Sequence, residues 1–89
     1  MRISPLQIYQ AKKRIGPWVK RTPLMRAHDL SELCGAEIWN KLEILQPTGA
    51  FKLSGATNTI LQLNEDERKR GVVASSTVNR GRAVAYAAC

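Results

Sequence analysis

The chain has 89 residues, 44% of them hydrophobic and 24% charged, and its formal net charge is +7. This length allows one small domain with a marginal core, because so short a chain buries about two-thirds or less of the surface that it exposes when unfolded. No apolar run is long enough to span a bilayer, and the first residues lack a basic start followed by an apolar block. We therefore expect a cytoplasmic protein with no membrane partner. Cys34 and Cys89 lack metal-ligand spacing, so reduced thiols are the simplest interpretation, and a disulfide between them stays open.

The positive charge is unevenly distributed along the chain. All seven acidic residues lie between Asp29 and Glu67. In the segments before and after this range, every charged residue is basic. Such basic blocks can attract the phosphates of nucleic acids. No zinc-finger, RNP or helix-turn-helix pattern accompanies the charge, so a nucleic-acid-binding module is the less favoured alternative.

The first residues predict a helix with a strong start. Ser4 is the candidate N-cap, Pro5 takes the first helical position and Gln7 completes a capping box. Apolar residues at spacings of three and four then share one face, and Gly16-Pro17 stops the helix. An extended stretch follows at residues 21–24.

The middle of the chain predicts a short helix and a strand. Residues Leu30 to Leu33 read as helical, and Gly35 supplies the left-handed residue that ends such a helix. The segment from Glu37 to Glu43 is strand-like and carries apolar residues on both faces. We therefore expect cover on both faces, as in a parallel or mixed sheet.

The next segment predicts a helix that begins near a lysine. Pro47 and Gly49 end the extended segment, Thr48 is the candidate cap and Lys52 falls in the first turn. An amine there lies at the positive end of the helix dipole, and it can attack an aldehyde if it is desolvated or near positive charge. Most lysines are solvated surface charges, however, so spacing alone favours a surface lysine. Gly55 costs this helix about 1 kcal/mol relative to alanine, which predicts close packing or the approach of a cofactor.

The last third predicts a short helix, a strand and a final helix. Asn64 caps a helix with acidic residues in its first turn and basic residues in its last, and Gly71 ends it; this charge run is therefore structural. The apolar residues 72–76 predict a buried strand, 77–81 a loop, and 82–89 a helix. This order of helices and strands indicates an α/β fold. The loop's backbone N–H groups could hold a carboxylate, but the pattern alone favours a plain connection.

The lysine segment resembles a family motif. Pro47-Thr48-Gly49-Ala50-Phe51-Lys52, followed by Gly55-Ala56, resembles the lysine motif of the fold-type II pyridoxal-phosphate enzymes, the tryptophan-synthase-β-like superfamily. Within it, the segment is similar to the threonine/serine dehydratase and serine racemase branch. The resemblance covers essentially all residues and implies that 1–89 form the amino-terminal part of a longer catalytic domain. It implies a partial tryptophan synthase β-like fold, with an incomplete, mostly parallel sheet and flanking helices.

The resemblance also implies an activity. Lys52 would hold pyridoxal 5'-phosphate as a Schiff base and remove the Cα proton of a hydroxy amino acid such as L-threonine or L-serine, leading by β-elimination to a 2-oxo acid and ammonia. Residues 76–81 resemble the Ser-x-Gly-Asn-His loop that holds the substrate carboxylate. On this alignment Asn79 contacts both cofactor and substrate, and the residues that border the substrate are Ser76, Thr77 and Val78.

Three positions depart from the family pattern. Val78 replaces a glycine, Arg80 replaces the usual histidine and Ser54 replaces an arginine. If that glycine has a positive φ, a β-branched valine would be strained there. The glycine-rich loop that grips the cofactor phosphate lies later in family chains. We therefore expect the 89-residue chain alone to be inactive, and a non-catalytic truncated remnant is the alternative. Full-length relatives are expected to be homo-oligomers.

Overall fold

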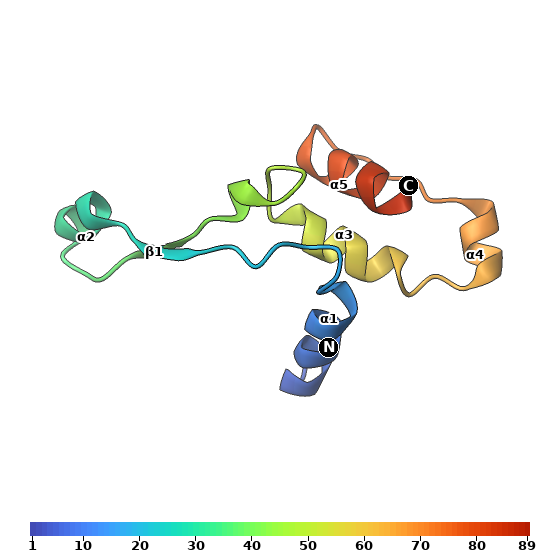
Figure 1. The fold of residues 1–89 in the computed structure, drawn as a ribbon, viewed down its shortest axis with the longest axis horizontal. Helices are drawn as coiled ribbons and strands as arrows, with labels where there is room; N and C mark the ends of the chain where they lie inside the picture. The colour runs from blue at the N-terminus through green and yellow to red at the C-terminus, as the bar shows by residue number, and fades with distance from the viewer.

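The computed structural model describes all 89 residues, as five α-helices, one 3-10 helix and two short strands (Figure 1). In chain order these are α1 (Pro5–Ile15), β1 (Leu24–Arg26), α2 (His28–Cys34), β2 (Trp39–Lys41), the 3-10 helix η1 (Glu43–Leu45), α3 (Lys52–Ile60), α4 (Glu65–Arg70) and α5 (Asn79–Ala88). The molecule is elongated, with extents of 52 × 31 × 26 Å. Helices α3 and α5 form its centre, and the strands form an arm with α2 at its tip (Figure 1). None of the helices combines the length and apolarity needed to cross a membrane.

Helix α1 has the predicted start. The Ser4 hydroxyl accepts a hydrogen bond from the Gln7 N–H at 3.2 Å, and the Gln7 side chain accepts one from the Ser4 N–H at 2.8 Å. Pro5 stands at the first helical position, where a missing N–H costs nothing. The predicted capping box is therefore confirmed. No residue of α1 is buried, so this helix lies on the surface of the molecule.

The two strands pair antiparallel, with Leu24 opposite Lys41 and Arg26 opposite Trp39. This corrects the prediction of parallel or mixed pairing for the 37–43 segment, of which only the three residues of β2 form a strand. All six residues of the pair are exposed, so the expected cover on both faces is also wrong. The physical reason is that the strand pair projects from the helical centre, and apart from α2 at its tip no other element lies against it (Figure 1).

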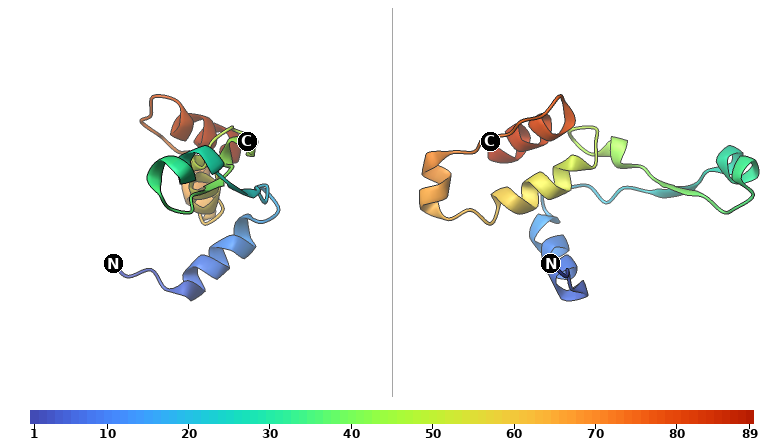
Figure 2. Two further views of the ribbon diagram at one scale, coloured as in Figure 1. Left: turned by 90° about the vertical axis from the view of Figure 1, so that its left-hand side faces the viewer. Right: turned by 180° about the vertical axis from the view of Figure 1, so that it is seen from behind.

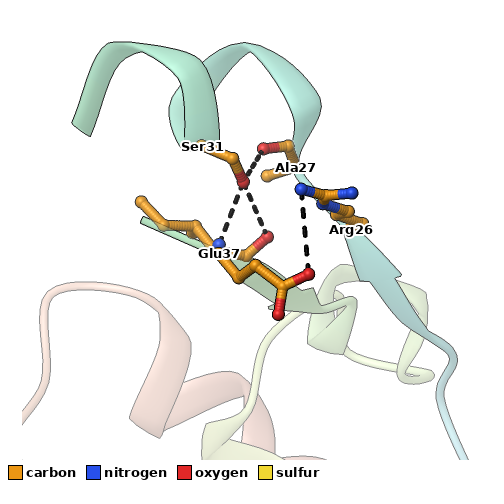
Figure 3. Close-up of polar contacts among 5 residues, drawn as sticks. Arg26, Ala27, Ser31 and Glu37 are labelled. Carbon is orange, nitrogen blue, oxygen red and sulfur yellow. Dashed lines mark hydrogen bonds and ion pairs between the residues drawn. The ribbon is translucent and has the colours of Figure 1, made fainter. Parts of the chain in front are cut away.

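Helix α2 folds back on the arm through one buried hydroxyl (Figure 3). Ser31 Oγ donates to the Ala27 carbonyl at 2.6 Å and accepts from the Ile38 N–H at 2.9 Å. Gly35 ends α2 with φ 64°, the left-handed conformation predicted for it. The Arg26–Glu37 ion pair beside it spans 3.7 Å between exposed side chains, so it adds little stability.

The core lies between α3 and α5, the two helices with the most extensive mutual contact. Leu53 on α3 and Ala83 on α5 have no exposed surface, and they are the only buried apolar residues of the chain. The small Ala83 side chain lets the two helices approach closely. Two buried apolar residues make a marginal core, as the length of the chain predicts.

The segment 72–76 forms no strand, which corrects the prediction of a buried one. Val72 is exposed and the side chain of Val73 is completely exposed. A strand needs a partner for its backbone groups, and neither β1 nor β2 pairs with this segment. Helix α4 before it is capped by Asn64, as predicted, and Glu67 completes a capping box; α5 after it begins at Asn79, earlier than the predicted Arg82.

Candidate functional site

A tight turn leads the chain into α3. The Gly49 N–H donates to the Gln46 carbonyl at 2.7 Å, with Pro47 at the second position of the turn. Proline suits that position because its φ is already set for it. Gly49 has φ 75°, a left-handed conformation that side chains other than glycine rarely adopt. The turn therefore determines where α3 begins.

Thr48 does not cap α3, contrary to the prediction. The N-cap position belongs to Phe51, which offers no side-chain hydrogen bond. Thr48 and Gly49 belong to the turn, and α3 begins only at Lys52. The Thr48 hydroxyl therefore lies too early in the chain to reach the first N–H groups of the helix. Thr48 is instead only 5% exposed, and its Oγ1 has no hydrogen-bond partner.

Lys52 is the first residue of α3 and its side chain is exposed. Its ammonium group lies 4.8 Å from the centroid of the neighbouring Phe51 ring and takes no part in an ion pair. The first turn of α3 contains no acidic residue, so the positive end of the helix dipole is not neutralised beside the amine. These residues thus supply the positive surroundings that a nucleophilic lysine needs, but they do not desolvate it.

The second predicted loop leads into α5. Ser76, Thr77 and Asn79 are exposed, and Asn79 is the first residue of the helix. Val78 is the N-cap, with φ −150° and ψ −69°, so its φ is negative and lies outside the left-handed region that favours glycine. The strain that a positive φ would impose on this valine is therefore absent. The first turn of α5, like that of α3, contains no acidic residue.

The packing of α3 on α5 brings the two predicted segments together. The helices lie side by side and run in the same direction, so their amino-terminal ends meet at one end of the pair (Figures 1 and 2). Lys52 and the 76–79 segment therefore lie at the same end of the α3–α5 pair. Unpaired N–H groups and the positive ends of both dipoles gather there, an arrangement that attracts anions.

Gly55 and the surface hollows complete the description of this region. A Cβ placed on Gly55 would meet nothing within 4 Å, so close packing within the chain does not explain this glycine. An apolar hollow of about 780 Å³ lies between the carboxyl ends of α3 and α5, and Trp18 lines it. A polar hollow of about 470 Å³ lies beside α2. Neither contains a predicted site residue.

The sequence did not predict the role of Gln46, the residue directly before the lysine segment. Its side chain is buried, and its carboxamide bonds to the backbone of Lys20. No periodicity or motif signals such a contact. The one local sign of this role is that a polar residue, Gln46, stands directly before Pro47.

Comparison with known proteins places these observations in a family. Residues 15–89 match the sequence model of the family described as pyridoxal-phosphate dependent enzyme. Over 86 residues the chain is 54% identical to a Sinorhizobium fredii protein provisionally named a threonine dehydratase, covering 97% of this chain and 26% of that protein. It is 49% identical over 81 residues to the L-threonine ammonia-lyase of Thermotoga maritima, covering 91% of this chain and 20% of the relative.

The structural comparison agrees. The structure of maize serine racemase superimposes with a TM-score of 0.81 at 41% identity, covering 91% of this chain and 26% of that one. The chain thus spans only about a fifth to a quarter of the length of the relatives that it matches. The predicted fold class and cofactor are confirmed at the level of the family. The match extends over most of the chain and includes Lys52, and the chain therefore belongs to the family of pyridoxal-phosphate dependent enzymes.

Proposed function

We propose that this chain is the lysine-bearing amino-terminal part of a pyridoxal-phosphate dependent ammonia-lyase that acts on a hydroxy amino acid such as L-threonine or L-serine. The observation that carries the proposal is the position of the free Lys52 amine at the same end of the helix pair as the 76–79 segment (Figures 1 and 2). The names of the relatives in Thermotoga maritima and maize support the substrate class.

The residues at this end fit pyridoxal phosphate. The cofactor carries an aldehyde, a phosphate and a ring hydroxyl, and it stabilises negative charge at the substrate Cα when it is bound. The Lys52 amine, which forms no ion pair, suits the aldehyde. The amino-terminal ends of α3 and α5, free of acidic residues, suit anionic groups. The unpartnered Oγ1 of the buried Thr48 is a further polar group that lacks a protein partner.

Each residue has a distinct role in this proposal. Lys52 anchors the cofactor and, once substrate has taken its place, removes the Cα proton with its Nζ. Ser76, Thr77 and Val78 border the substrate and hold its carboxylate through backbone N–H groups and hydroxyls. The Asn79 amide orients cofactor and carboxylate together. Loss of the β-hydroxyl, followed by hydrolysis, gives a 2-oxo acid and ammonia.

We expect the 89-residue chain to capture the cofactor weakly and to show no turnover. The exposed Lys52 amine remains in water, and water must be excluded for a lysine to act efficiently as a base. Arg80 is also exposed in the first turn of α5, where it adds a positive charge in place of an imidazole. A non-catalytic remnant would share these features, so cofactor capture must be measured directly.

Reductive trapping tests the proposal. The chain is incubated with pyridoxal phosphate, reduced with borohydride and mapped by peptide mass spectrometry. We expect the label to collect on Lys52 in preference to the other five lysines. Lys69, an exposed lysine in the last turn of α4, is the matched reference, and Lys69→Arg should not alter labelling of Lys52. Equal labelling of Lys52 and Lys69 would show that the amine has no special surroundings and would reject the proposal.

A further inference from the structure

The Gln46 carboxamide forms a complete set of hydrogen bonds in the interior. The residue is 5% exposed. Its Oε1 accepts from the Lys20 N–H at 2.9 Å, and its Nε2 donates to the Lys20 carbonyl at 2.8 Å and to Glu43 Oε2 at 3.3 Å. The side chain thus pairs with both backbone groups of Lys20, much as a neighbouring strand would. Because each of these groups is satisfied, the contact stabilises one arrangement of the two segments.

The backbone of Gln46 bonds on both sides as well. Its N–H donates to the Glu43 carbonyl at 3.1 Å, closing η1, and its carbonyl accepts from the Gly49 N–H at 2.7 Å, opening the turn into α3. Lys52, the first residue of α3, follows three positions after Gly49. Gln46 therefore links the segment before β1 to the turn that precedes Lys52.

A second set of bonds holds the same two segments together. Thr22, also 5% exposed, donates from Oγ1 to the Glu43 carboxylate, and its carbonyl accepts from the Lys41 ammonium. Glu43 thus receives hydrogen bonds from both Thr22 and Gln46. Three of the five buried polar residues, Thr22, Gln46 and Thr48, belong to this region. Most of the buried polar residues of the molecule therefore lie in or next to the turn that precedes α3.

We infer that Gln46 is a positioning residue for Lys52, an inference that rests on the proposed function. The buried Leu53 fixes the helix itself. The turn that precedes the helix is attached differently: among residues 46–51, only the Gln46 side chain forms hydrogen bonds, and it forms them with Lys20 and Glu43. Without the carboxamide, the turn loses its attachment to Lys20, and the first turn of α3 can fray. The amine then spends less time at the end of the helix pair where the 76–79 segment lies.

The test compares Gln46→Ala with Gln62→Ala, a matched control whose amide makes one exposed hydrogen bond, to the Asn58 carbonyl at 2.8 Å. Amide hydrogen exchange is measured at Lys20 and Gly49, and labelling by pyridoxal phosphate and borohydride at Lys52 and Lys69. In Gln46→Ala we expect exchange at Lys20 to accelerate and the Lys52-to-Lys69 labelling ratio to fall, each by at least about fivefold, because three side-chain hydrogen bonds are lost and one buried bond alone has about this effect. Gln62→Ala should change neither.

The two proposals fail in different ways. Unchanged exchange at Lys20 and Gly49 in Gln46→Ala would reject the positioning role, whatever the labelling shows. Accelerated exchange with an unchanged labelling ratio would show a merely structural residue and would also reject it. A wild-type chain without preference for Lys52 would reject the proposed function itself. If Gln46→Ala loses its helical circular dichroism signal, Gln46→Glu replaces it: the acceptor for the Lys20 N–H remains, the two donors are lost, and the labelling ratio should still fall.

Discussion

Arg14 donates a 2.6 Å hydrogen bond from Nη1 to Oδ1 of Asn58, and this bond ties α1 to α3. It joins residues that are 44 positions apart and is the only side-chain hydrogen bond between these two helices. Since no residue of α1 is buried, the attachment of the helix depends on few contacts.

Arg14→Ala should therefore loosen α1 more than Lys13→Ala does. A partly buried charged hydrogen bond contributes about 1.5–3 kcal/mol, whereas the neighbouring Lys13 is exposed and makes no such bond. Hydrogen exchange across residues 8–15 measures the effect, and α3 should keep its protection. Equal exchange in the two variants would show that the bond does not hold α1 in place.

Leu53→Ala should unfold much of the chain, because Leu53 is one of two apolar residues in the core. Removing a buried leucine costs about 2–5 kcal/mol, which is comparable to the whole stability of so small a domain. Leu33→Ala is the matched control, since Leu33 is 82% exposed. Urea unfolding followed by circular dichroism compares the two, and a similar midpoint for both variants would place the core elsewhere.

Substitution by alanine should have opposite effects at two glycines of the lysine segment. Gly49 has φ 75°, so Gly49→Ala should destabilise the chain by about 1–2 kcal/mol through backbone strain. Gly55 lies within α3 with open space around it, so Gly55→Ala should stabilise the helix by about 1 kcal/mol.

Thermal unfolding of both variants gives the signs directly. If the cofactor approaches the backbone at Gly55, the explanation that remains once close packing within the chain is excluded, the stabilised Gly55→Ala chain should nevertheless show weaker trapping at Lys52. Stabilisation together with unchanged trapping would leave that glycine without a role in binding.

Val78→Gly should not stabilise the chain. The φ of Val78 is negative, so glycine gains nothing here from its tolerance of a positive φ, and it raises the entropy of the unfolded state. A loss of about 0.4–1 kcal/mol is expected in the free energy of unfolding. A gain would mean that the N-cap of α5 is strained after all.

Local elements of this chain were predictable because their determinants lie within a few residues of each other. The Ser4–Gln7 capping box, the Asn64 cap and the left-handed Gly35 were read from the sequence and are present in the structure. Where a contact between distant segments decides the outcome, prediction failed. The composition of 72–76 suits a strand, but a strand also requires a neighbour, and none pairs with it.

The candidate site divides in the same way. The lysine segment and its family resemblance were visible in the sequence, as was a loop, predicted at 77–81, of which residues 79–81 belong to α5. The expected cap at Thr48 was wrong because the turn closed by Gly49 places that threonine too early in the chain. The role of Gln46 could not be read at all, since its partner Lys20 lies 26 residues away.

The sequence by itself determined where α1 and α4 begin and to which family the chain belongs, since caps and motifs act over one or two helical turns. The tertiary structure alone decided that α3 and α5 lie side by side in the same direction, and so brought Lys52 to the end of the helix pair that carries Asn79. Packing of this kind depends on the burial of Leu53 and Ala83, residues 30 positions apart, and no local pattern encodes their meeting.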